Sequence, residues 1–325
     1  MRPFESVMAN YLADYAAYRE QRGYALKAIY PPLVALDRYL KANDVSWEQM
    51  QRPAFLLHLR ATISPHPNTT NRMLSHVRGL FDYLIRRQII AANPLNDIPP
   101  VPERYFVPFV FSPEQTDQLL KAVCAAIRRN PTHFLFDQGI YLAMMMLARC
   151  GMRINEPLRL CRHHYRPDDG SLYIERTKFR KDRLIPLPKA LLVELDNYLA
   201  ARKACCPADH NPFLLAGRNG QPLKVDRFRR VFHRAVEASG LKQPKRIMGN
   251  MTFGSPVPHS LRHSFAINTL NRIKARGISP RHALPVLAAY MGHRKYQYTA
   301  AYLKVKDADD LAGLIAFTKS QLDVV

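Results

Sequence analysis

Cysteine is scarce in this sequence and shows no metal-binding spacing. The five cysteines are an odd number and include no Cys-x-x-Cys pair. Zinc ribbons and disulfide frameworks need paired, regularly spaced cysteines. We therefore expect reduced thiols in a reducing compartment.

Long apolar segments are also missing. The longest apolar run, Ile140 to Ala148, is far shorter than the roughly 20 residues that cross a bilayer. The first residues place Glu5 and Asp14 in an amphipathic pattern, with neither the apolar stretch nor the small-residue cleavage site of a signal peptide. We expect no membrane segment and a cytoplasmic protein.

Acidic residues are few beside the basic ones. The 325 residues include 26 Asp and Glu against 48 Lys and Arg, a net charge of +22. Residues 1–100 hold 12 basic and 8 acidic side chains, which leaves 36 and 18 for residues 101–325. Such an excess suits a polyanionic partner, and nucleic acid is the first candidate.

The chain has no internal repeat and no low-complexity tract, and its apolar pattern indicates two domains. Apolar residues recur at helical spacing from Phe4 to Tyr18 and from Met73 to Ile85. The prolines between Pro94 and Pro102 then oppose helix formation. We predict a helical domain over residues 1–100, a linker over 101–108 and a second domain over 109–325.

The second domain combines helices with one predicted hairpin. Ser112, Pro113 and Gln115 have the spacing of a capping box with proline at the first helical position. Two segments of alternating pattern, 172–176 and 183–187, flank the polar residues 177–182 and predict a β-hairpin with a cationic tip. The expected fold is mainly α, a helical domain followed by an α+β domain with a small hairpin sheet.

Five short strings in the second domain occur in a distinctive order. They are Gly151-Met152-Arg153-Ile154-Asn155-Glu156, Thr177-Lys178, His259-Ser260-Leu261-Arg262-His263, Gly292-His293, and Tyr302 nine residues after His293. In this order they resemble the tyrosine recombinase (phage integrase) family. The resemblance implies a catalytic domain over residues 109–325 that cleaves and rejoins DNA strands through a covalent 3′-phosphotyrosine intermediate.

Two arginines and a tyrosine carry the central chemistry implied by this resemblance. Attack on a phosphodiester builds negative charge on the non-bridging oxygens, and the fork of an arginine binds such oxygens without losing its proton. Arg153 and Arg262 are the candidates, although Arg153 can also be a helix-start residue that pairs with Glu156. Spacing in the family selects Tyr302 as nucleophile, rather than Tyr296 or Tyr298.

Proton movement is assigned to two histidines and a lysine. His259 and His293 can each donate or accept a hydrogen bond near the phosphate. The resemblance implies Lys178 as the acid that protonates the departing 5′ oxygen, with Lys181 as an alternative because the flanking glycines common in the family are absent. A second departure is residues 271–285, which we expect to form an extended loop.

The resemblance covers nearly the whole chain, because residues 68–94 are similar to the last helix of the family's SAM-like core-binding domain. It implies that the two domains clamp duplex DNA. Arg72 and Arg78 are candidate DNA contacts in the first domain. In the second, a helix with Phe228, Val231 and Phe232 on one face offers four more, Lys224, Arg227, Arg229 and Arg230.

The expected partners are double-stranded DNA carrying specific recombination sites and other copies of the chain. In this family a tail such as residues 307–317 docks on a neighbouring subunit, which implies a DNA-bound homotetramer. No metal or cofactor is expected, since an arginine pair supplies the charge, and Cys161, His163 and His164 lack a fourth ligand.

The alternative functions are those of a type IB topoisomerase-like enzyme that relaxes DNA and of a catalytically inactive DNA-binding protein. Integration, excision and resolution of a mobile element or replicon remain open, as does inversion.

Overall fold

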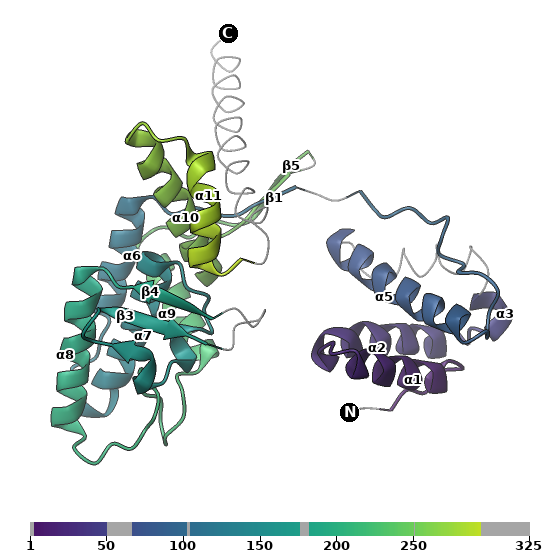
Figure 1. Ribbon diagram of the computed structural model, residues 1–325, viewed down its shortest axis with the longest axis horizontal. Coiled ribbons are helices and arrows are strands. Elements are labelled where there is room, and N and C mark those ends of the chain that lie inside the picture. The colour runs from purple at the N-terminus through teal and green to yellow at the C-terminus, as the bar shows by residue number, and fades with distance from the viewer. Residues whose placement is uncertain (1–2, 51–66, 103–104, 176–181, 250, 294–325) are drawn as a thin grey trace, which may run out of the picture. The chain divides into compact units, whose positions relative to one another are not determined.

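The chain folds into two units, each with its own core. The computed structural model describes residues 3–50, 67–102, 105–175, 182–249 and 251–293 (Figure 1). The first unit is Met1–Tyr105 and the second is Phe106–Val325. Helices make up most of both units, as the sequence predicts. Among the described residues, no helix combines the length and apolar character needed to cross a membrane.

The first unit is a small helical bundle. It contains α1 (Ala9–Gln21), α2 (Leu26–Ala42), α3 (Trp47–Met50) and α5 (Pro67–Arg86). Each of the three longer helices buries one stripe of apolar side chains in a shared core, as helical spacing of apolar residues requires. The core includes Leu12, Tyr15, Leu33, Leu36, Leu40, Leu74, Val77 and Phe81.

The proline-rich segment after α5 runs back along that helix. The Arg78 guanidinium donates to the carbonyl oxygens of Leu95, at 3.4 Å, and of Ile98. The side chain of Asn71 both donates to and accepts from the backbone of Val101, each bond being 2.8 Å long. These contacts, with turn hydrogen bonds from Asn96 to Asn93 and from Ile98 to Leu95, satisfy backbone groups of a segment that belongs to no helix or sheet.

The second unit begins with α6 (Pro113–Ala125), whose predicted start is confirmed. The Oγ of Ser112 accepts a hydrogen bond from the Gln115 backbone at 3.1 Å, and the Gln115 side chain accepts one from the Ser112 backbone at 3.0 Å. This reciprocal pair satisfies donors that a helix start would otherwise leave open.

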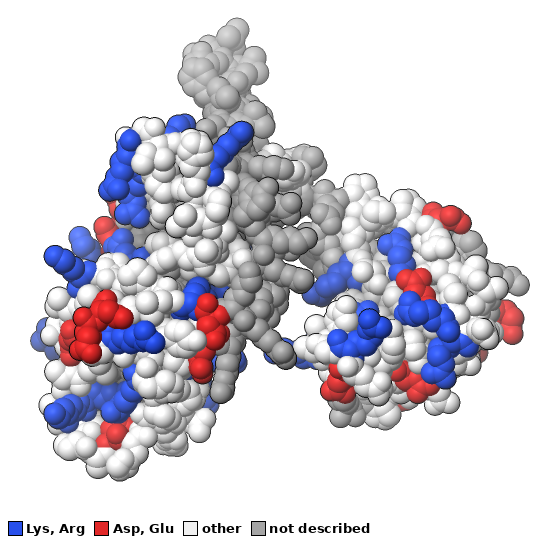
Figure 2. Space-filling model, viewed as in Figure 1, with Lys and Arg blue, Asp and Glu red and all other residues white. Residues whose placement is uncertain are grey.

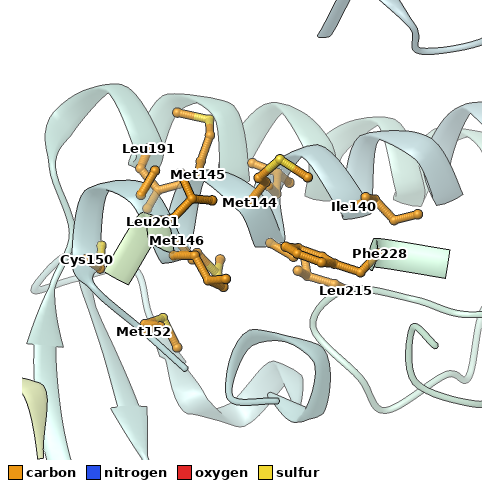
Figure 3. Packing of buried hydrophobic residues seen from close by; sticks show 14 of the residues in the cluster. Ile140, Met144, Met145, Met146, Cys150, Met152, Leu191, Leu215, Phe228 and Leu261 are labelled. Atoms are coloured by element: carbon orange, nitrogen blue, oxygen red, sulfur yellow. The ribbon is translucent and has the colours of Figure 1, made fainter. Parts of the chain in front are cut away.

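Helix α7 (Pro131–Cys150) runs through the core of the second unit. It packs against α6, α8 (Lys189–Cys205) and α10 (Pro258–Ala275), while α9 (Val225–Ala238) covers α6. Figure 3 shows Met144 and Met146 of α7 among Leu191, Phe228 and Leu261. Complete burial of such a side chain contributes roughly 1.5–3 kcal/mol, so this core fixes the ends of the helices around it.

The predicted hairpin is present. Strand β3 (Ser171–Ile174) pairs antiparallel with β4 (Arg183–Pro186), with Ile174 opposite Arg183, and β2 (Tyr165–Arg166) extends the sheet on the other side of β3. Two single 3₁₀ turns, Pro157–Arg159 and Arg162–His164, lead from α7 to this sheet. The hairpin tip, 176–181, lies outside the described residues.

A second small sheet was not predicted. It has the order β1-β6-β5, from β1 (Tyr105–Val107), β6 (Met251–Phe253) and β5 (Arg246–Met248). Each strand is only three residues long, too short to show a period-2 pattern. The available signal was the Gly-Asn dipeptide at 249–250, typical of a tight hairpin turn, with Gly249 at φ +57°.

The expectation of an extended loop over residues 271–285 is wrong. Helix α10 continues to Ala275, and α11 (Pro280–Met291) begins five residues later with Ser279 as its N-cap and Pro280 as its first residue. Ser-Pro there is a helix start, not an interruption. Pro285 lies inside α11, where its missing N–H removes one backbone hydrogen bond without ending the helix.

Candidate active site

Arg153 lies in the turn that follows α7. Gly151 ends that helix at φ +59°, and a Cβ there would lie 2.3 Å from the Phe265 ring, so only glycine fits. The backbone N–H and Nη1 of Arg153 donate to the Glu156 carboxylate at 2.8 and 2.9 Å, and Nη2 donates to the Gly292 carbonyl at 2.7 Å. Arg153 is thus paired with Glu156 and also reaches the end of α11.

Arg262 is a buried cation on α10, with 1% of its surface exposed. Its guanidinium donates to the carbonyl oxygen of Gly151, to that of Met291 at 2.7 Å, and to Nε2 of His293 at 2.9 Å. Arg153 and Arg262 therefore contact the same two segments, the end of α7 and the end of α11. Two guanidiniums that are distant in sequence converge on one place.

His293 follows the left-handed Gly292, which caps α11 at φ +65°. A guanidinium can only donate, so Nε2 of His293 accepts from Arg262 and the neutral ring carries its proton on Nδ1. Burial and the positive charges of Arg262 and Arg153 lower the pKa of His293 to about 4. The ring is neutral near pH 7 and, because Nε2 accepts from Arg262, offers its Nδ1–H as a hydrogen-bond donor.

His259 lies in the first turn of α10, one turn before Arg262, and its side chain is exposed. Its ring meets that of His263 edge to face, with centroids 4.5 Å apart. Desolvation by the surrounding protein and the charges of Arg262 and Arg153 lower the pKa of His259. His259 thus lies on the same helix as Arg262, three residues before it.

Two residues of this site were not assigned a role from the sequence. Glu156 was considered only as a partner of Arg153, and Arg183 only as a strand residue. In the structure the Arg183 guanidinium donates to both Glu156 oxygens, at 3.1 and 2.8 Å. Burial raises the pKa of Glu156, but hydrogen bonds and charge from Arg183 and Arg153 outweigh it and hold the pKa below its usual range. Glu156 is therefore an anion shared by two arginines.

Three predicted residues cannot be placed. Lys178, the alternative Lys181 and Tyr302 all lie outside the described residues, as do Tyr296, Tyr298 and the segment 307–317. The structure thus gathers Arg153, Arg262, His259 and His293, and the roles of the lysine and the tyrosine stay predictions.

The two DNA-binding candidates of the first unit differ in their surroundings. Arg72 is exposed on α5. Arg78 is half-buried, and its guanidinium is engaged with the carbonyls of Leu95 and Ile98. Arg78 thus has a structural role in addition to any contact with DNA.

On α9 the predicted division between faces is present. Phe228 and Phe232 are fully buried, while Lys224, Arg229 and Arg230 are exposed. Arg227 differs from these three, because it is half-buried and its Nη2 lies 3.8 Å from Asp137. Figure 2 shows basic side chains exposed on the second unit, including the end where α10 turns into α11.

Two of the three residues considered as metal ligands, His163 and His164, form a small cluster with Glu175. Their ligand atoms lie within 4.8 Å of one another, and Cys161 is not part of the group. However, the Cys161 backbone N–H donates to Nδ1 of His164 at 2.8 Å, so the neutral ring carries its proton on Nε2. That atom faces Glu175 at 3.4 Å. A metal-bound histidine usually donates from its other nitrogen, which this arrangement prevents.

Comparison with known sequences identifies similar proteins. A model of the phage integrase family matches residues 110–309. An integrase/recombinase of Sinorhizobium fredii is 28% identical over 89% of this chain and 90% of its own length. The tyrosine recombinase XerD of Pseudomonas putida is 27% identical over 85% of each chain.

Comparison with solved structures gives the same fold. A lambda integrase dimer bound to a COC′ core site matches with a TM-score of 0.66 and 18% identity, over 90% of this chain and 76% of that chain. The XerH site-specific recombinase bound to its difH substrate matches with a TM-score of 0.63 and 18% identity, over 87% and 78%. At this level of identity the likeness concerns the fold.

Proposed function

Because the chain belongs to the phage integrase family and is a tyrosine recombinase that cleaves and rejoins DNA, we propose that Arg153, Arg262, His259 and His293 surround the scissile phosphate. Tyr302 is the nucleophile in this proposal. The residues 109–325 form the catalytic domain, and residues 1–100 form a core-binding domain that completes the hold on DNA.

The observation that carries this proposal is the convergence of the two arginines. Arg262 donates to the carbonyl of Gly151, two residues before Arg153, and both guanidiniums donate to carbonyls at the end of α11. When a nucleophile attacks phosphorus in line, charge grows on the non-bridging oxygens. Fixed guanidiniums stabilise that charge without having to reorganise during the reaction.

The nucleophilic step forms a bond from the Tyr302 hydroxyl oxygen to phosphorus and breaks the bond to the 5′ oxygen. The phenol must give up its proton, and a neutral histidine can accept a hydrogen bond from it. The lowered pKa values of His259 and His293 keep both rings neutral near pH 7. With Nε2 of His293 already accepting from Arg262, this supports His259 as the ring that assists the proton and His293 as a hydrogen-bond donor that orients the phosphate.

The departing 5′ oxygen needs a proton, and the hairpin lysine is proposed to supply it. Lys178 is assigned this role, with Lys181 as its alternative on the same hairpin between β3 and β4. The phosphotyrosine ester preserves the energy of the broken bond. A 5′ hydroxyl from a second DNA strand can therefore reverse the step and exchange strands.

The partner is duplex DNA with specific sites, held by a homotetramer. Solved relatives of this fold include a lambda integrase tetramer bound to a Holliday junction, which supports assembly of this kind. The exposed cations of α9 and Arg72 are proposed DNA contacts, together with Arg78 and Arg227. Integration, excision or resolution of a mobile element or replicon is the proposed role.

Strand exchange is the test that separates the candidate activities. A bound site is first selected from genomic fragments of the source organism, and two labelled duplexes carrying it are incubated with the protein. Exchanged products are expected. Relaxation of supercoiled DNA without exchange would indicate topoisomerase-like activity, and binding without any cleavage would indicate an inactive DNA-binding protein.

A further inference from the structure

Arg183 is a buried arginine at the start of β4 with a role that the proposed reaction leaves open. Its side chain is 8% exposed, and it donates to both oxygens of Glu156, at 3.1 and 2.8 Å. Such a bidentate pair fixes both partners in orientation. Arg183 is 27 residues from Glu156 in sequence, so the bond joins β4 to the turn after α7.

Glu156 is shared symmetrically between two arginines. Its Oε1 accepts from Nη1 of Arg153 at 2.9 Å and from Nη1 of Arg183 at 3.1 Å. Its Oε2 accepts from the Arg153 backbone and from Nη2 of Arg183, both at 2.8 Å. Glu156 therefore orients Arg153, but alone it would also cancel the charge of Arg153.

The charge of Arg183 changes that balance. Glu156 with Arg153 alone is a neutral pair, whereas Glu156 with both arginines carries one positive charge. A group with net positive charge stabilises a phosphate whose negative charge is growing more strongly than a neutral pair does. Arg183 thus allows Glu156 to position Arg153 without neutralising it.

Arg183 also contacts the end of α11. A Cβ at Gly292 would lie 3.0 Å from Nη1 of Arg183, so the guanidinium packs closely against this glycine. The Gly292 carbonyl accepts from Arg153 at 2.7 Å, and His293 follows directly in the chain. Arg183 therefore supports the segment that presents His293 as well as the one that presents Arg153.

We propose that Arg183 is a positioning and charge-balancing residue for DNA cleavage, which acts through Glu156 and does not touch the phosphate itself. The inference rests on the proposed function. A purely structural ion pair is the other interpretation of the same contacts. The two differ in what they predict when Glu156 is changed together with Arg183.

The experiment measures single-turnover formation of the covalent adduct on saturating DNA, in the full-length protein. The variants are Arg183→Gln, Arg183→Lys, Glu156→Gln and the double variant Arg183→Gln with Glu156→Gln. Arg162→Gln is the matched control, because it removes an exposed cation whose guanidinium pairs with Asp209, at 3.0 Å, rather than with Glu156. Urea melts and DNA dissociation constants are measured for each.

Arg183→Gln is expected to slow adduct formation about 10- to 100-fold at unchanged DNA affinity, the scale of a small misplacement of a catalytic group. Arg183→Lys should form the adduct faster than Arg183→Gln but more slowly than the wild type. The control Arg162→Gln should react at the wild-type rate. The double variant should be no slower than Arg183→Gln, because removing both members restores the net charge beside Arg153.

Two results would overturn the inference while leaving the proposed function intact. One is a wild-type rate for Arg183→Gln. The other is a double variant slowed by the product of the two single losses, with all rates following the loss of folding stability. A wild-type protein that forms no adduct would instead refute the proposed function on which the inference rests.

Discussion

The guanidinium of Arg262 donates a hydrogen bond to Nε2 of His293 at 2.9 Å, across 31 positions of sequence. Because the same guanidinium holds the carbonyls of Gly151 and Met291, one buried side chain sets the relative position of α7, α10 and the end of α11. The site and the fold of the second unit therefore depend on the same residue.

Replacing Arg262 should affect both stability and reaction. Arg262→Lys keeps the charge but cannot reproduce three diverging contacts, so buried carbonyl oxygens lose their donors. We expect a loss of about 1–3 kcal/mol in the free energy of unfolding. Adduct formation should fall about 10²–10³-fold beyond any effect of unfolding. Urea denaturation and single-turnover cleavage measure the two effects, and near-wild-type cleavage by a folded Arg262→Lys protein would contradict the assigned role.

Acid should destabilise the second unit through two half-buried histidines, His263 and His293. The folded pKa values of His293, about 4, and His263, about 3, lie below the ordinary histidine value, in both cases mainly through burial. The unfolded chain therefore binds more protons between about pH 6.5 and 4. Stability from these rings is complete above about pH 6.5 and is lost as the pH falls, by at most about 1.4 kcal/mol per pH unit for each ring.

The corresponding test compares urea midpoints at pH 7.5 and 5. His293→Gln should lose less stability over this range than the wild type, while a substitution of the exposed His210 should leave the difference unchanged. Equal losses in all three proteins would mean that His293 is not held as a neutral ring in the folded protein.

Gly292 should not tolerate alanine. Its φ of +65° disfavours any side chain, and the new Cβ would press on Nη1 of Arg183 at 3.0 Å. Gly277→Ala is a matched control, because Gly277 has φ +78° with nothing within 4 Å of its Cβ position. Both should lose about 1 kcal/mol from backbone strain. Only Gly292→Ala should also slow adduct formation, and equal cleavage rates would argue against the contact with Arg183.

The exposed cations of α9 should contribute to DNA affinity through phosphate contacts. Changing Arg229 and Arg230 together to Gln should weaken binding and reduce the slope of log affinity against log salt by about 1.8, which is about 0.9 per phosphate contact. Lys242→Gln removes an exposed cation paired with Glu237 at 2.7 Å and serves as the control. An unchanged salt dependence in the double variant would mean that Arg229 and Arg230 do not contact DNA phosphates.

Local signals in the sequence predicted local structure well. The capping box at Ser112 and Gln115 and the hairpin of β3 and β4 each depend on residues close in sequence, and both were confirmed. The sheet β1-β6-β5 joins residues about 150 positions apart through strands of three residues, and no short-range pattern indicates such a pairing. The error over residues 271–285 came from comparing the interval between Arg262 and His293 with the family, whereas the local pattern Ser279-Pro280 starts a helix.

The site was predictable only in part for a similar reason. An ordered set of motifs identified Arg153, Arg262 and the two histidines, which the fold brings within reach of one another. Arg183 had no motif, because its importance comes from a bond to Glu156 that only the fold creates. The sequence offered one hint of its importance: Arg183 begins β4 directly after the polar hairpin tip and lies opposite Ile174 of β3.

The most direct test of the account is the identity of the nucleophile. Purified protein is incubated with nicked DNA carrying its selected site, and the protein–DNA adduct is digested and sequenced to find the modified residue. Wild type, Tyr296→Phe and Tyr298→Phe are expected to form an adduct through Tyr302, and Tyr302→Phe none. An adduct formed by Tyr302→Phe at the wild-type rate would contradict the central claim.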